Sequence, residues 1–232
     1  MEAFGSALRH QTEVHWLVHD DNGRRSRLPV RRWHGSAEPA VDAVVTRCAG
    51  PTLDLGCGPG RLTLALTRAG LTAVGVDISA QAVRMTRARG AVALQRDIFD
   101  PLPAEGTWSH VALIDGNIGI GGDPVTLLDR CLDLLRPDGT VLVELEPPGF
   151  GLWRGQARLA VRTARGGLRL GPSFLWARLD TAAVDGVAKA AGLTVRGVFH
   201  HDRRWFTELA ISRPSEIDRS QPAAPGRDLS TQ

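Results

Sequence analysis

Short apolar runs alternate with amphipathic stretches through the middle of the chain. Each run is rich in Val, Leu and Ala and is followed by a turn or by a helical pattern, which favours a buried β-strand. Five such runs begin at Leu53, Leu71, Ala91, Val111 and Gly139. Helical patterns begin near Leu62, span Pro124 to Leu135, and span Thr181 to Ala191. Strands that alternate with helices predict an α/β fold with a mostly parallel sheet.

An acidic residue follows or closes each predicted strand. These acids are Asp54, Asp77, Asp97, Asp115 and Glu146. In open parallel sheets, ligands bind beyond the carboxyl ends of the strands, so the acids are expected at the ligand-binding edge. The alternative for some of them is an ordinary solvated loop residue.

Three glycines lie at alternate positions in the segment that follows the first strand. Gly56, Gly58 and Gly60 allow positive φ angles and close approach of the backbone to a ligand. An ordinary strand-to-helix turn would have the same glycines. Asp77 lies about twenty residues later, where a carboxylate can accept both hydroxyls of a ribose. Asp97 and Ile98 suit an adenine, because the acid can accept from the amino group while the apolar side chain covers the ring.

The glycine spacing separates two cofactor families. A dinucleotide-binding turn has a third glycine where this chain has Arg61, so no pyrophosphate clamp is expected. The pattern Asp-x-Gly-x-Gly-x-Gly from Asp54 instead resembles the S-adenosylmethionine site of class I methyltransferases. The resemblance covers roughly Cys48 to Pro147.

The resemblance implies a Rossmann-like methyltransferase fold, with helices on both faces of the sheet and an antiparallel last strand. It also implies S-adenosyl-L-methionine as cofactor and S-adenosyl-L-homocysteine as product. Asp54 would orient the glycine loop or the amino group of the cofactor. The other cofactor-binding residues would be Gly56, Cys57, Gly58 and Gly60 at the methionine and ribose, Asp77 at the ribose, Asp97 and Ile98 at the adenine, and also Ile78, Asp115 and Gly116.

The remaining segments predict additions to this domain. Residues 1–35 form an N-terminal cap with a β-hairpin around Asp20 to Gly23, where Val14 to Val18 and Arg27 to Val30 are the strands. Residues 36–212 form the methyltransferase domain, which starts with a helix from Pro39 to Cys48. An insertion at about 150–178 reads as a second hairpin, although the spacing of Arg154, Arg158 and Arg162 would also suit a helix. A strand pair, 193–200 and 203–211, closes the sheet, and the polar residues 213–232 are expected to be disordered.

Methyl transfer requires alignment of an acceptor, with a proton acceptor where the attacking atom is a hydroxyl. Asn117, just beyond the fourth strand, is the first candidate catalytic residue. His34 and His200 are further candidates because histidine titrates near neutral pH. The alternative for each histidine is a surface or packing role. The two predicted hairpins and Trp33 would enclose the acceptor.

Composition and charge limit the classes of binding partner that are expected. The net charge is +3, but the cations are arginines with Lys189 as the only lysine, which suggests a compositional bias rather than nucleic-acid binding. No apolar run could span a bilayer and no signal peptide is evident, so a cytoplasmic protein is expected. Cys48, Cys57 and Cys131 suggest neither a disulfide nor a metal site.

The sequence therefore predicts an S-adenosylmethionine-dependent methyltransferase that acts on an oxygen or nitrogen of a small molecule, as a monomer or homodimer. Three alternatives stay open: a cyclase or lyase with the same cofactor, an RNA methyltransferase, and a non-catalytic cofactor-binding subunit. The identity of the acceptor does not follow from the sequence.

Overall fold

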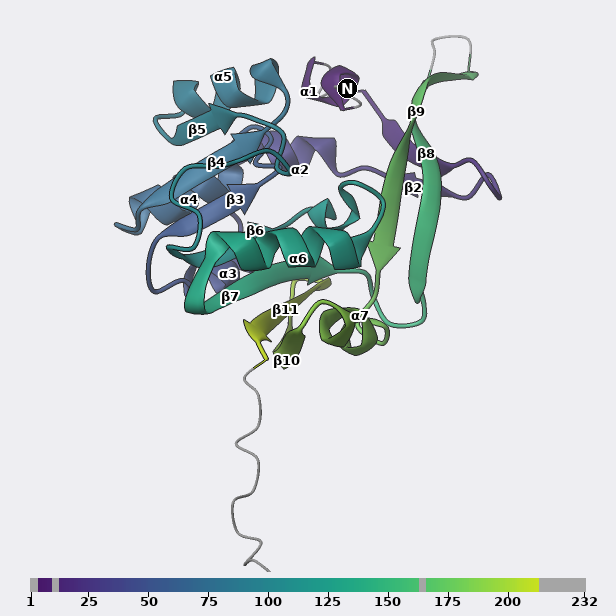
Figure 1. Ribbon diagram of the computed structural model, residues 1–232. Coiled ribbons are helices and arrows are strands. Elements are labelled where there is room, and N and C mark those ends of the chain that lie inside the picture. The colour runs from purple at the N-terminus through teal and green to yellow at the C-terminus, as the bar shows by residue number, and fades with distance from the viewer. Residues whose placement is uncertain (1–3, 10–12, 163–165, 213–232) are drawn as a thin grey trace, which may run out of the picture.

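The computed structural model describes residues 4–9, 13–162 and 166–212, and the tail at 213–232 that the sequence predicts to be disordered lies outside the described residues. The described residues form two β-sheets and the helices that pack against them (Figure 1). Within the described residues, no helix is long and apolar enough to cross a membrane.

The larger sheet has seven strands in the order β10-β11-β7-β6-β3-β4-β5. Their bounds are β3 Thr52–Leu55, β4 Ala73–Asp77, β5 Val92–Gln95, β6 Trp108–Leu113, β7 Leu135–Leu145, β10 Leu193–His201 and β11 Arg204–Ile211. Strands β7, β6, β3, β4 and β5 are mutually parallel, and β11 is antiparallel to β7. The predicted fold class is thus confirmed.

One strand is shorter than its apolar run. The sequence predicts a third strand that reaches Asp97 and Ile98, but β5 ends at Gln95. Its neighbour β4 ends at Asp77, which is paired with Gln95, so no partner strand continues beyond that point. Asp97 and Ile98 consequently lie in the loop at the carboxyl edge of the sheet.

Helices cover both faces of this sheet. Helices α3 Pro39–Val45, α4 Arg61–Arg68 and α5 Ala80–Ala88 pack on one face, and α6 Pro124–Leu134 and α7 Val184–Ala190 pack on the other. Side chains alternate accordingly along the strands. Leu53 and Leu55 contribute to the core beneath α6, whereas Asp54 points toward α4.

The second sheet has four antiparallel strands in the order β2-β1-β8-β9. The strands are β1 His15–His19, β2 Arg25–Arg27, β8 Leu152–Arg162 and β9 Leu168–Leu179. The segment near 155–178 is therefore a hairpin and not a helix. The sequence places a second N-terminal strand at Arg27 to Val30, but the strand ends at Arg27 and Val30 begins the short helix α2 Val30–His34.

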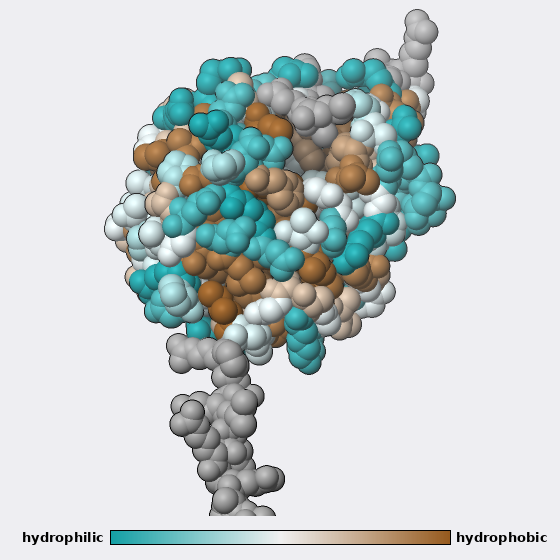
Figure 2. Space-filling model, in the orientation of Figure 1, coloured by the Kyte–Doolittle hydropathy of each residue, from teal (hydrophilic) through white to brown (hydrophobic). Residues whose placement is uncertain are grey.

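The two predicted hairpins form one sheet, because β1 pairs with β8 from His15 opposite Val161 to His19 opposite Ala157. Figure 1 shows them together on one side of the molecule, and their outer rim is mostly hydrophilic (Figure 2). The inner face packs on α2 and the helix α1 Gly5–Arg9 through Leu17, Trp33 and Trp176. The short 3-10 helix η1 Asn117–Gly119 lies so close to β9 that a Cβ at Gly119 would be 2.2 Å from the Ala177 carbonyl oxygen.

Gly60 and Gly70 provide a matched test of packing at the glycine turn. Their φ angles are +82° and +80°, but a Cβ at Gly60 would lie 2.5 Å from Thr86 Cγ2, whereas nothing lies within 4 Å at Gly70. Gly70→Ala should lower the free energy of unfolding by about 1 kcal/mol through backbone strain alone. Gly60→Ala should cost roughly 1–3 kcal/mol more, because Thr86 must move. Urea unfolding without ligand measures both, and equal losses would contradict close packing at Gly60.

Candidate active site

A cavity of about 800 Å³ lies between the carboxyl edge of the central sheet and the inner face of the four-stranded sheet. The loops after β3, β4, β5 and β6 line one side, and α1, α2 and β9 line the other. Most of the predicted cofactor residues line it: Asp54, Gly56, Cys57, Gly58, Asp77, Ile78, Asp97, Ile98, Asp115 and Gly116. Gly60 is the exception, because it packs beneath the turn against Thr86.

The glycine turn is held in shape by its neighbours. Gly56, Gly58 and Gly60 have φ angles of +72°, +53° and +82°, a region that favours glycine. The Gly58 amide donates to Asp77 Oδ2 at 2.9 Å, and the Ser79 amide donates to Asp77 Oδ1 at 2.8 Å. The carboxylate of Asp77 is therefore oriented by two backbone groups at the end of β4.

In the structure, Asp54 links two elements of the protein. Its Oδ2 accepts from the Thr63 amide at 3.1 Å and from Thr63 Oγ1 at 2.6 Å, which ties β3 to the first turn of α4. Burial raises the pKa of Asp54 to about 6, although the hydrogen bonds from Thr63 act in the opposite direction. These hydrogen bonds connect the segments on either side of the glycine turn.

The three predicted catalytic residues lie in different places, and only Asn117 lines the cavity. Asn117 lines the cavity, and its Nδ2 donates to the carbonyls of Leu55 at 2.8 Å and Gly56 at 2.9 Å, so this amide braces the glycine turn. His34 lies outside the cavity lining and its Nε2 is 3.4 Å from the Ala7 carbonyl oxygen. Burial lowers the pKa of His34. His200 is exposed on β10 beside Trp205 and is also outside the lining.

A cluster of charged side chains that sequence reasoning missed lies at the base of the cavity. Arg61 pairs with Asp115 at 2.6 Å and with Glu38 at 2.7 Å. Arg204 donates to both oxygens of Glu144 at 2.8 and 2.6 Å, contacts Asp115 at 3.1 Å, and pairs with Glu38. These contacts commit both oxygens of Asp115 and of Glu144 to arginines.

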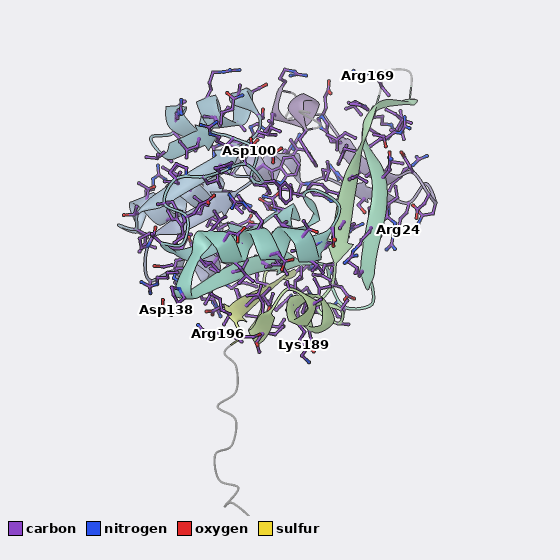
Figure 3. The ribbon with its side chains drawn as sticks, in the orientation of Figure 1. Arg24, Asp100, Asp138, Arg169, Lys189 and Arg196 are labelled. Carbon is purple, nitrogen blue, oxygen red and sulfur yellow. The ribbon has the colours of Figure 1, made fainter. Side chains whose placement is uncertain are left out.

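Both arginine side chains are almost fully buried, with 4% of Arg61 and 5% of Arg204 exposed. Burial alone would lower the pKa of Arg204, but the attraction of Glu144, Asp115 and Glu38 prevails and raises it. By contrast, Figure 3 shows Asp138, Lys189 and Arg196 at the periphery of the molecule. The cluster residues come from distant segments, so no local spacing could have revealed them.

Arg32 lines the cavity next to this cluster but is held loosely. Its Nη2 is 3.4 Å from Asp115 Oδ1 and its Nε is 3.7 Å from Glu38 Oε1. Neither distance is a strong hydrogen bond, and Arg32 Nε is buried without a hydrogen-bond partner among the described residues. Arg32 therefore presents a cation to the cavity with unused donors.

Aromatic rings line the side of the cavity below the four-stranded sheet. The ring of Phe4 lies 6.1 Å from Trp33, 5.5 Å from Phe174 and 5.3 Å from Trp176, measured between centroids. We call these four rings the aromatic wall. Glu146 and Arg178 line the same region as an ion pair at 2.7 Å. The cavity thus has a polar, glycine-rich half and an aromatic half.

The raised pKa of Asp54 predicts a pH-dependent stability difference. The folded carboxyl binds its proton more tightly than the unfolded one, so the parent loses stability as the pH rises from about 4 to about 6. Asp54→Asn removes this titration. Its free energy of unfolding, relative to the parent, should therefore rise by up to about 3 kcal/mol between pH 4 and pH 7. Urea unfolding at both values measures the difference, and a constant difference would show that Asp54 titrates normally.

Comparisons with known proteins agree with this geometry. Residues 52–139 match the family model described as a methyltransferase domain. No curated protein matches the sequence. A methyltransferase from Bacteroides fragilis, solved with S-adenosyl-L-homocysteine, has a TM-score of 0.70 at 19% identity, over 91% of this chain and 95% of that chain.

Two further solved structures have the same fold. The 1,6-didemethyltoxoflavin-N1-methyltransferase from Burkholderia thailandensis has a TM-score of 0.58 at 17% identity, over 78% of this chain and 81% of that chain. An amino pentose methyltransferase from Micromonospora echinaspora has a TM-score of 0.57 at 16% identity, over 78% of this chain and 94% of that chain. Residues 52–139 therefore match a methyltransferase domain, and the chain shares its fold with these solved methyltransferases.

Proposed function

We propose that this enzyme transfers the methyl group of S-adenosylmethionine to an oxygen or nitrogen of a small molecule. One observation carries the proposal: a single cavity joins the glycine turn and its acids to an aromatic wall. Its volume of about 800 Å³ lies in the upper part of the range of roughly 300–1,000 Å³ typical of small-molecule sites. There is room for a nucleoside-containing cofactor and a second, smaller molecule.

The polar half suits the cofactor. Asp77, oriented by the amides of Gly58 and Ser79, would accept from the ribose hydroxyls, and Asp97 with Ile98 would hold the adenine. When bound, S-adenosylmethionine supplies a methyl group already activated by its sulfonium. The residues of the chain then need only to orient the acceptor and exclude water. Cys57, Leu62 and the aromatic wall supply the apolar surface for that exclusion.

Arg32 adds a residue to the proposed cofactor site. A carboxylate is the natural partner of a guanidinium with unused donors. Asp115 and Glu38 already lie within 3.7 Å of Arg32, so it stands at the polar end of the cavity. We infer that Arg32 binds the carboxylate of the methionine portion.

The similar structures favour a small acceptor. One is a 1,6-didemethyltoxoflavin-N1-methyltransferase, one is an amino pentose methyltransferase, and another is a sugar N-methyltransferase. These activities belong to those proteins, and at identities of 16–17% they support the acceptor class and not its identity.

Calorimetry tests cofactor binding directly. S-Adenosylmethionine and S-adenosylhomocysteine should bind in the micromolar range, about 8 kcal/mol. Asp77→Ala should weaken binding by roughly 2–3 kcal/mol, because the ribose loses charge-assisted hydrogen bonds, and Asp77→Asn should lose less. Asp138→Ala, at an exposed carboxylate far from the cavity, is the control. Binding of a nicotinamide dinucleotide instead, or unchanged affinity in both Asp77 variants, would overturn the assignment.

Arg32 has a matched control in its exposed neighbour Arg31. Arg32→Met should raise the dissociation constant of S-adenosylhomocysteine by about tenfold or more, since a hydrogen bond between charged groups is lost. Arg31→Met should leave it unchanged. 5′-Methylthioadenosine lacks the amino-acid portion and should bind the parent and Arg32→Met equally. A similar loss for both ligands would show that Arg32 acts through the fold and not through the carboxylate.

A further inference from the structure

We propose that the acceptor is an amine and that Glu146 binds its nitrogen, with the ring-containing body of the acceptor against the aromatic wall. This inference rests on the proposed function and specifies the acceptor atom as nitrogen. The carboxylates that line the cavity differ in how many of their oxygens already accept hydrogen bonds.

Glu146 is fixed in place yet leaves one oxygen open. Its amide donates to the Leu179 carbonyl at 2.8 Å, which anchors the residue between β7 and β9. Arg178 donates to Glu146 Oε1 through Nε at 2.8 Å and lies within 2.7 Å through Nη2. Among the described residues, no group donates to Oε2. A carboxylate can accept about four hydrogen bonds, so Oε2 has capacity for a ligand in the cavity.

All three nitrogens of the Arg178 guanidinium contact residues of the chain. Its Nε and Nη2 are occupied by Glu146, and its Nη1 donates to Ser26 Oγ. The face of its guanidinium lies over the ring of Phe150, 4.1 Å from the centroid. The side chain is mostly buried, with 12% exposed. The Glu146 side chain is 28% exposed, so the acid is the more accessible member of the pair.

The other acids that line the cavity are either held by arginines or lie in the half assigned to the cofactor. Asp115 and Glu144 are held on both oxygens by arginines. Asp54 accepts from Thr63, and Asp97 accepts from the Phe99 amide in the half assigned to the cofactor. Glu146 is thus the carboxylate on the acceptor side that can receive a new donor.

The aromatic wall strengthens the preference for a cation. Trp33 and Trp176 are 8% and 9% exposed, and both line the cavity together with Phe4 and Phe174. Aromatic faces attract ammonium groups, and they also stack on rings of the acceptor. An alcohol would gain the hydrogen bond to Glu146 but neither the ionic nor the cation–π attraction. A carboxylate would be repelled by Glu146.

The proposed methyl transfer to the amine accounts for every proton and electron pair. A bound ammonium first gives one proton to Glu146, which leaves a neutral amine. The nitrogen lone pair then forms the new bond to the methyl carbon, and the electron pair of the carbon–sulfur bond goes to sulfur. The products are a methylated ammonium and a neutral thioether. Glu146 afterwards releases its proton to water.

Matched amine and alcohol probes test the proposal without knowledge of the natural acceptor. The pairs are 2-phenylethylamine with 2-phenylethanol, and glucosamine with glucose, titrated into the protein saturated with S-adenosylhomocysteine at neutral pH. For at least one pair, the parent should bind the amine about tenfold or more tightly than the alcohol. Glu146→Gln should reduce that preference to about threefold or less. Glu13→Gln, an exposed residue outside the cavity lining, should keep it.

Affinity for S-adenosylhomocysteine and the melting temperature, measured on every variant, show whether Glu146→Gln is folded. The preference of the parent is an independent test that needs no variant. Equal binding of amine and alcohol in both pairs, no binding of either amine, or an amine preference that survives in folded Glu146→Gln would each overturn the proposal. If S-adenosylhomocysteine itself failed to bind the parent, the proposed function would fail instead.

Discussion

The cluster of Arg61 and Arg204 with Glu38, Asp115 and Glu144 is the interaction on which the cavity depends. Removing charges from water costs several kcal/mol for each ion, and the cost is repaid only where each charge is well paired. Here each buried guanidinium contacts carboxylates from two or three segments. The cluster joins the start of α3, the glycine turn, the ends of β6 and β7, and the turn into β11. Loss of one arginine would leave acids uncompensated at the base of the site.

The polar character of the sheet edge explains why the cavity needs the second sheet. The carboxyl edge of a parallel sheet offers loops rich in glycine and acid, which are poor walls for an apolar acceptor. The pairing of β1 with β8 makes the two hairpins one surface, and their inner face supplies Leu17, Phe174 and Trp176. Helix α2 connects that surface to the cluster, because Arg32 and Glu38 flank the segment between α2 and α3.

The elements that the sequence predicts well are those with local signals. The five strand runs, the hairpin turn near Asp20 and the glycine turn depend on residues close together in the chain, and the structure has all of them. The pairing of β1 with β8 joins segments that are far apart in the sequence and leaves no periodic signal. For the same reason the sequence does not reveal Arg204, whose partners lie in other elements, and it leaves His200 among the candidates behind Asn117.

The acids at the strand ends show that position alone does not define a role. Asp54 follows the expected motif, yet Thr63 turns it into a brace, and Asp115 is taken by arginines. Glu146 follows its strand as the other acids do, but it keeps an open oxygen because Arg178 contacts only Oε1. The role of each acid depends on the hydrogen-bond donors that the neighbouring helix or strand places beside it. Adjacent residues of α2 extend this logic, since Arg32 lies at the polar half of the cavity and Trp33 at the aromatic half. A shift of this one short helix would therefore alter both halves together.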